Sequence, residues 1–430
     1  MRGRAALPGF VLGLAVAGLL GGCGPEGPAP AKQGATVAER APAYAEARQG
    51  LGAAIDSGLS LAGARPDDGL LPLEVASLYV ERARLTGDYA DFARAQALLD
   101  SRPPGSKKTA SHCLAQARLH YTLHRLARAA ETLAACPPGT DPAELGAIRA
   151  DIAMYSGRYR EAEAGYRSLL NQSGTPQQYV RLALLKARTG SPAEATALLE
   201  AAEKRYHGGA ATMKAWLRLQ RGLVALDRGR FDEALALYRL AGDALAGWWL
   251  VDEHVAEVTF LRGDARAARD LYASVLGRTG APEFMDALAV LEAQEGRAEP
   301  ARALLREARA LHERRLSEFP EAAAGHALAH FLRDAGEARR ALDLARANFA
   351  ARPYGEAAIA LARAWMLSGK PERAPALLEA QLAAGWDTAE AYWVLGEALG
   401  RLGRGERAAE ARAQALARNP FAERMYALPR

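Results

Sequence analysis

The chain has 430 residues, of which half are hydrophobic but only 7% are aromatic, and its formal charge is +5. This length excludes one compact core and predicts two or three domains or an extended repeat, while abundant Ala, Leu, Arg and Glu favour closely packed helices over strands. The net charge is small for a chain of this length, and the sequence has no basic block or interleaved aromatic stripe. We therefore expect no nucleic-acid partner.

Residues 1–22 are predicted to form a signal peptide. Arg2 and Arg4 precede an apolar run over residues 5–20, which is too short for a comfortable membrane span. The Leu-Gly-Gly-Cys that follows resembles the lipobox of bacterial lipoproteins, whose Cys, here Cys23, becomes the acylated first residue of the mature chain. An uncleaved transmembrane anchor or an ordinary secretory signal is the alternative.

The resemblance implies that Cys23 holds the protein on a lipid bilayer through two or more acyl chains. Gly24 stands where the inner-membrane retention signal of such lipoproteins would place Asp. We therefore expect the periplasmic face of the outer membrane if the cell is Gram-negative. Residues 23–42 would be the acylated Cys and a Pro- and Gly-rich disordered tether.

Residues 43–108 are predicted to be helical. Gly87, Tyr89 and Ala93 repeat, out of phase, a spacing that recurs further along the chain. We interpret this segment as a degenerate repeat that caps the N-terminal end of a longer array.

Cys113 and Cys136 are the only cysteines after Cys23, and their midpoint falls near His124, where two helices are predicted to meet in a turn. Residues equidistant from the turn of an antiparallel helical pair face each other, so a disulfide is sterically reasonable. An oxidising periplasm would permit it. Two free, buried thiols are the alternative.

A Gly followed five residues later by an Ala recurs through most of the chain. Successive glycines are 33, 39, 34, 33, 40, 33 and 34 residues apart, which is a 34-residue period with two insertions. An earlier unit fits at Ala129, with His124 in place of the Gly. The glycines are Gly157, Gly190, Gly229, Gly263, Gly296, Gly336, Gly369 and Gly403, and the alanines are Ala162, Ala195, Ala234, Ala268, Ala301, Ala341, Ala374 and Ala408.

This pattern resembles the tetratricopeptide repeat (TPR), and the last unit shows the likeness best. The resemblance implies an all-α fold, a right-handed superhelical solenoid of about nine helical hairpins over residues 109–421, with residues 422–430 as a C-terminal tail. The matching residues of the last unit are Tyr392, Leu395, Gly396, Ala408 and Pro420.

The spacing also has a direct physical reading. A small residue recurs midway along each predicted first helix, so paired helices can approach closely. The Gly between the helices can adopt the positive φ that ends the first one. Each hairpin is amphipathic and incomplete alone, so burial must come from stacking. The small residues are Ala150, Ala183, Gly222, Ala256, Ala289, Ala329, Ala362 and Gly396.

In the resembled family the first helices line a concave groove that binds a protein or peptide. The same register here implies a groove that changes from apolar to acidic and then to a stretch of His and Arg, which suits an extended peptide of complementary charge. The alternative is that these charges pair across repeats or face water. The implied residues are Trp216, Leu219, Leu223, Glu253, Glu257, Asp286, His326, His330, Arg363, Trp393 and Glu397.

His326 and His330 have the i, i+4 spacing that lets two imidazoles meet one metal ion. Ala327 stands where a zinc protease motif needs its Glu base, so that reading fails. Metal binding, partner contact and ordinary packed or solvated histidine remain open for this pair. Because no catalytic motif is present, we expect no metal, no cofactor and no enzyme activity.

These observations predict a membrane-anchored scaffold or adaptor that binds other proteins in envelope assembly or secretion. Two alternatives remain at this stage. One is a component of envelope polysaccharide export, and the other is a metal or small-ligand site inside the superhelix, centred on His326 and His330.

Overall fold

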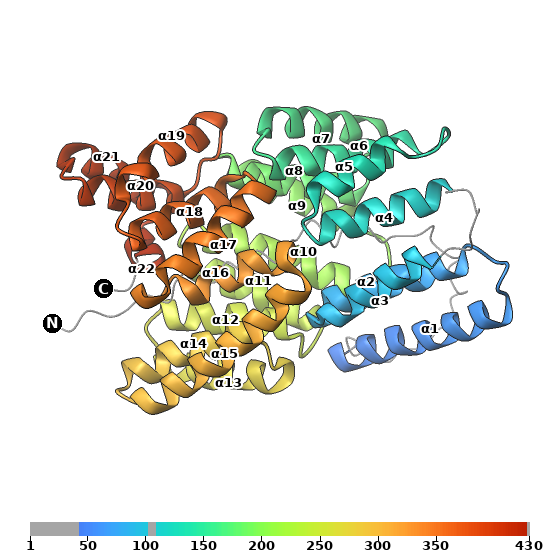
Figure 1. Cartoon of the computed structure of the whole chain (residues 1–430), viewed down its shortest axis with the longest axis horizontal. Helices are drawn as coiled ribbons and strands as arrows, with labels where there is room; N and C mark the ends of the chain where they lie inside the picture. Colours follow the sequence, from blue (N-terminus) through green and yellow to red (C-terminus); the bar gives the residue numbers. More distant parts are fainter. Residues whose placement is uncertain (1–42, 102–108, 428–430) are drawn as a thin grey trace.

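The computed structural model describes residues 43–101 and 109–427, so the leader, Cys23 and the tether lie outside the described residues. Within the described ranges the fold is all-α, and the one β-type contact is an isolated bridge between Thr189 and Asp387 (Figure 1). The helices are α1 (Tyr44–Ala64), α2 (Leu71–Thr86), α3 (Tyr89–Asp100), α4 (Ala110–Thr122), α5 (Leu126–Ala134), α6 (Pro142–Tyr155), α7 (Tyr159–Ser173), α8 (Pro176–Arg188), α9 (Pro192–Arg205), α10 (Ala211–Leu226), α11 (Phe231–Ala244), α12 (Trp249–Leu261), α13 (Ala265–Thr279), α14 (Pro282–Gln294), α15 (Ala298–Glu318), α16 (Pro320–Phe331), η2 (Ala335–Glu337), α17 (Ala338–Ala351), α18 (Gly355–Leu367), η3 (Pro371–Arg373), α19 (Ala374–Ala384), α20 (Ala389–Arg401), α21 (Gly405–Arg418) and α22 (Ala422–Tyr426).

From α4 to α21 the helices pair in sequence into nine hairpins, and each hairpin packs on the next. The predicted solenoid of TPR-like helical hairpins is therefore confirmed. Helices α1 to α3 precede it, and the short α22 follows it. Among the residues that the structure describes, no helix is both long enough and apolar enough to cross a membrane.

The turns between paired helices show why Gly recurs. Seven of the eight ladder glycines have positive φ, and in the earlier unit His124 has φ 60°, the only positive value at a non-glycine among the described residues. Gly336 is the exception, because it lies in η2, where its N–H donates to Asp334 Oδ1 at 2.8 Å. An Asp-capped 3-10 turn thus replaces the left-handed turn at that junction.

Gly222 and Ala150 lie where paired helices approach most closely, whereas Ala329 is partly exposed and lines a cavity described below. A Cβ added at Gly222 would collide with the Tyr238 ring, and one at Gly165 would lie 2.9 Å from the Cβ of Ala150. Larger side chains there would push the helices apart.

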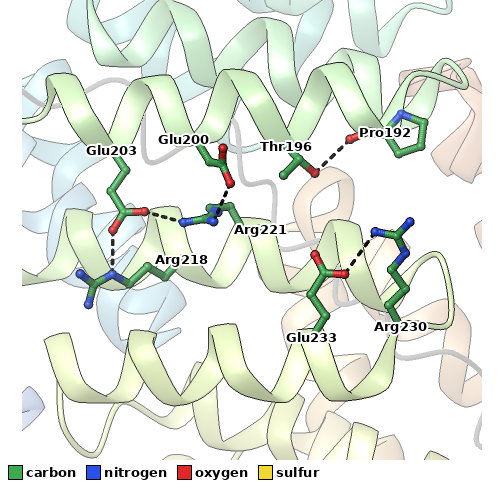
Figure 2. Close-up of polar contacts among 8 residues, drawn as sticks. All are labelled: Pro192, Thr196, Glu200, Glu203, Arg218, Arg221, Arg230 and Glu233. Carbon is green, nitrogen blue, oxygen red and sulfur yellow. Dashed lines mark hydrogen bonds and ion pairs between the residues drawn. The ribbon is translucent and has the colours of Figure 1, made fainter.

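Ion pairs join α9 to α10, the first helix of the next hairpin (Figure 2). Glu203 of α9 accepts from Arg218 Nε at 2.8 Å and from Arg221 Nη1 at 2.9 Å, while Glu200 accepts from Arg221 Nη2 at 2.8 Å. These groups are partly exposed, so each pair contributes only about 0–1 kcal/mol. Apolar burial between hairpins must supply most of the stacking energy.

Distant turns of the solenoid also touch. Tyr159 Oη, in the α7 hairpin, donates to Gln381 Oε1 at 2.7 Å and accepts from the N–H of Gly355 at 2.9 Å. The N–H of Asp387 donates to the carbonyl oxygen of Arg188 at 2.8 Å. The C-terminal hairpins therefore pack against α7 and α8, which lie about two hundred residues earlier.

Further contacts extend this closure at both ends of the chain. Asn419 Nδ2 donates to the carbonyl oxygen of Asp227 at 3.1 Å. The indole N–H groups of Trp248 and Trp249 donate to the carbonyl oxygen of Leu85 at 3.2 and 3.0 Å. The solenoid is consequently a closed body, in which segments from both ends of the described chain pack against its middle hairpins.

A disulfide joins Cys113, early in α4, to Cys136, just after α5, across 23 residues of sequence. A loop of this size stabilises the folded chain by about 3 kcal/mol. It fixes the first of the nine hairpins, the one in which His124 replaces the turn Gly.

Candidate binding cavity

A cavity of about 410 Å³ lies where α16 to α18 and α20 to α22 face the ends of α8 and α10. Closure of the superhelix creates it, because its walls come from segments that are far apart in the chain. The wall is rich in charge, with five carboxylates, His326 and six arginines. The arginines are Arg188, Arg228, Arg333, Arg352, Arg363 and Arg418.

Three of the carboxylates pair with arginines that also line the cavity at its α8 side. Arg188 reaches Asp227 Oδ2 at 2.6 Å and Glu356 Oε1 at 3.1 Å, and Arg418 Nε reaches Asp387 Oδ1 at 2.5 Å. Burial raises the pKa of Asp227, and the charge of Arg188 opposes that rise. Of these three pairs, the one between Arg188 and Glu356 joins distant hairpins, and all three balance negative charge on this wall.

The other two carboxylates are also paired. Arg363 Nη2 lies 3.2 Å from Glu390 Oε1 and donates to the carbonyl oxygen of Tyr426 at 2.9 Å. Arg315, behind the wall, donates to Glu283 Oε1 at 2.8 Å. Every carboxylate of the cavity wall is therefore already matched by an arginine.

Arg352 differs from these arginines. It follows α17 directly and is only 3% exposed, yet no carboxylate of the described residues pairs with it. Its Nη2 donates to Asn348 Oδ1 at 2.9 Å, while its Nε has no hydrogen-bond partner in the part of the chain that the structure describes. Its guanidinium lies 5.3 Å from the ring centre of Tyr354 and 5.9 Å from that of Tyr155.

His326 is partly buried in the same wall. Burial lowers its pKa to about 4, and although Glu283 opposes this effect, the charges of Arg315 and Arg352 add to it. The imidazole is therefore neutral near pH 7 and can accept or donate one hydrogen bond toward the cavity.

Of the residues that the repeat register assigns to a groove, His326 and Arg363 lie in the cavity wall. Most of the others are buried against the chain itself. Leu223 and Glu397 are partly buried, and Glu397 accepts from Trp393 Nε1 at 3.2 Å. Most of the surface that the register assigns to a groove is therefore buried against other parts of the chain, both earlier and later in the sequence. The buried ones are Trp216, Leu219, Glu253, Glu257, Asp286, His330 and Trp393.

His330 does not converge with His326. It contacts Asp286 Oδ1 at 2.7 Å through Nδ1, and His312 Nε2 lies 3.0 Å from Asp286 Oδ2. Burial alone would raise the pKa of Asp286, but the hydrogen bonds from both histidines lower it to about 2. We call these three buried residues the Asp286 cluster.

A second buried group, which we call the Glu253 cluster, consists of Glu253, His254 and Glu257 on α12. His254 Nδ1 lies 3.2 Å from a carboxylate oxygen of each acid and hydrogen-bonds to Glu257, while neither oxygen of Glu253 has a hydrogen-bond partner among the described residues. Burial raises the pKa of Glu253 to about 8, with Glu257 and Glu283 adding to the rise and His254 opposing it.

Both clusters have the donor types that could hold a metal ion, and in each the donor atoms lie within 4.8 Å of one another. In the Asp286 cluster the carboxylate oxygens are occupied by the two imidazoles, so an ion would have to replace those hydrogen bonds. No residue of either cluster lines the cavity, although the nearby Glu283 does.

The repeat register could not identify Arg352, Asn348 or Arg188. It assigns inward-facing positions within first helices. Asn348 and Arg352 lie at the end of a second helix, and Arg188 is the last residue of the first helix α8. Nothing in the repeat spacing marks those positions, since a distant turn decides what they face.

The fold and cavity define a closed helical-repeat solenoid with TPR-like hairpins. No protein-family model matches the chain, and no curated protein matches it. Among solved structures it resembles yeast Tom70, with a TM-score of 0.43 and 13% identity, covering 86% of this chain and 88% of that one.

Two further solved structures give similar comparisons. A tetratricopeptide repeat protein from Parabacteroides merdae has a TM-score of 0.33 and 19% identity, covering 57% of this chain and 94% of that one. PilW, a type IV pilus biogenesis factor, has a TM-score of 0.39 and 16% identity, covering 50% of this chain and 96% of that one. The function proposed below therefore rests on the chain's own residues.

Proposed function

We propose that this chain is a scaffold that binds other proteins, held on a bacterial envelope membrane by an acylated Cys23. The observation that carries the scaffold role is the exposed N-terminal end of the solenoid. Helix α1 has 21 residues, of which only Ile55 is buried. It lies at one edge of the molecule and packs on α2 (Figure 1).

The apolar side chains of this end favour a protein partner. Leu59 and Leu61 on α1 are each 38% exposed, and Leu70, just before α2, is 56% exposed. The outer face of a terminal repeat is normally polar, because nothing stacks on it. Three large apolar side chains exposed at such an end favour a surface that another protein covers.

The test is site-specific photocrosslinking in intact cells, with the photoreactive residue at Leu59 or Leu61. We expect a discrete adduct with another polypeptide from both positions. Leu416 on α21 provides the matched control, because it is 43% exposed and apolar but lies in the last hairpin. Absence of an adduct at α1, or equal adducts at all three positions, would contradict docking at this end.

The anchor has its own test. A Cys23→Ala variant cannot carry the thioether-linked lipid, so we expect it to move from the membrane fraction to the soluble fraction. A Cys113→Ala variant, which removes a thiol of the disulfide instead, should stay with the membrane. Retention of the Cys23→Ala protein in the membrane fraction would reject the lipid anchor while leaving the scaffold role open.

A further inference from the structure

We propose that the cavity inside the closed superhelix binds a small organic anion, a carboxylate or a phosphate ester on an apolar body, with Arg352 as its anchor. This inference goes beyond the scaffold role and does not depend on the surface at α1.

The first step is the charge of the wall. Its five carboxylates are all paired with arginines, through Arg188, Arg363, Arg418 and, from behind, Arg315. Arg352 is left without a carboxylate although it is almost fully buried. A buried charge is costly unless it is paired, so the wall is complementary to a negative group beside Arg352.

The second step is the preparation of Arg352 for such a group. Asn348 accepts a hydrogen bond from one end of the guanidinium, and the rings of Tyr354 and Tyr155 lie together beside it. Gly325 of α16 leaves it room, since a Cβ at that position would lie 3.1 Å from Arg352 Nη2. A planar guanidinium held in this way on the cavity wall matches the oxygens of a carboxylate or phosphate.

The third step concerns the size and the remaining walls. A volume of about 410 Å³ falls within the range of small-molecule sites in proteins. Leu328, Ile359 and Trp386 add apolar surface to the charged groups. The ligand that fits is therefore an anion with an apolar body, since a bare ion would leave this surface uncovered and a cation would face the arginine excess.

Isothermal titration of the full-length chain, purified in detergent, tests the proposal with benzoate, phenyl phosphate and benzylamine. We expect at least one anion to bind with a Kd below about 1 mM and benzylamine not to bind. A preference for phenyl phosphate would assign the ligand to phosphate esters, and a preference for benzoate would assign it to carboxylates.

Two variants act on the cavity in different ways. Arg352→Gln removes the anchoring charge and should weaken anion binding at least about tenfold. Ala329→Leu adds bulk to the cavity wall without changing charge and should weaken it to a similar extent. The control is Arg412→Gln, because Arg412 also lies over an aromatic ring, that of Trp393, but outside the cavity wall.

Thermal unfolding of each variant is measured first. If Arg352→Gln does not fold, the Ala329→Leu variant decides the question. Anion binding that is lost in the cavity variants and kept in Arg412→Gln supports the site. The proposal is overturned if neither anion binds, if benzylamine binds equally well, or if affinity persists in every folded cavity variant.

Discussion

The two buried clusters contain similar residues, but they differ in how their carboxylates are hydrogen-bonded. In the Asp286 cluster the three side chains come from α14, α15 and α16, and both oxygens of Asp286 meet an imidazole. In the Glu253 cluster all three side chains come from α12, and Glu253 has no hydrogen bond among the described residues. The comparison shows that a buried carboxylate is fully hydrogen-bonded in this fold where neighbouring helices supply its donors.

The reason is the number of donors. The single imidazole of His254 lies between two carboxylates and hydrogen-bonds to one of them, whereas the one carboxylate of Asp286 meets two imidazoles. The consequence is opposite pKa directions, with Asp286 lowered to about 2 and Glu253 raised to about 8. The folded chain therefore keeps Asp286 charged and Glu253 neutral near pH 7.

The largest effect is expected from Asp286→Ala. The substitution leaves the ring nitrogens of His312 and His330 without their acceptor in a buried place, so the free energy of unfolding should fall by about 3 kcal/mol. Urea denaturation at pH 7 measures it. Asp343→Ala, at an exposed position of α17, should change stability by less than about 0.5 kcal/mol. Equal losses in the two variants would mean that the imidazoles do not depend on this carboxylate.

A smaller effect is expected from pH. Glu253 binds a proton in the folded chain that the unfolded chain releases above its ordinary pKa of 4.5, so stability falls as the pH rises toward about 8. Between pH 6.5 and 8.5 the loss from Glu253 should be on the order of 1–2 kcal/mol. The pKa of His254 is also raised, which adds a loss of the same sign.

Glu253→Gln isolates this contribution, because an amide resembles the neutral acid but cannot ionise. We expect its stability to vary less with pH than that of the unchanged chain, and to exceed it at pH 8.5. Glu410→Gln on the exposed face of α21 should keep the original pH dependence. A Glu253→Gln profile parallel to that of the unchanged chain would show that Glu253 ionises freely in the fold.

The smallest effect is expected from a matched pair of tyrosines, both four residues after a ladder Ala. Tyr166 Oη donates to Asp151 Oδ1 at 2.8 Å, whereas Tyr238 Oη has no hydrogen-bond partner in the described chain. Tyr166→Phe should cost about 1 kcal/mol, and Tyr238→Phe should change stability by less than about 0.5 kcal/mol. Thermal unfolding compares them, and a larger loss in Tyr238→Phe than in Tyr166→Phe would show that the Tyr238 hydroxyl does have a hydrogen-bond partner in the folded chain.

The local parts of this fold could be predicted from sequence because short-range physics determines them. The ladder spacing gives nine hairpins, and the substitution of His124 for Gly marks a turn that adopts φ 60°. Ala150 and Gly222 lie at close helix contacts, as their size requires. The turn at Gly336 differs because the nearby Asp334 supplies a competing local hydrogen bond.

The inner surface could not be predicted in this way. A repeat register states which side of a helix faces inward, but it does not state whether that side meets solvent or another turn. Glu253 and Asp286 face inward and are buried, while Arg352, which the register omits, reaches the cavity. Contacts such as that between Tyr159 and Gln381 depend on the accumulated curvature of many repeats, and no single spacing encodes that sum.

The bonds between Tyr159 and Gly355, and between Asn419 and Asp227, constrain how this chain can evolve. An open array can gain or lose a module by duplication or deletion, since each module touches only its neighbours. Here one added hairpin would shift every later module along the curve and separate these partners. The number of modules is therefore fixed by the ring they close, and change must come through loops and surface residues instead.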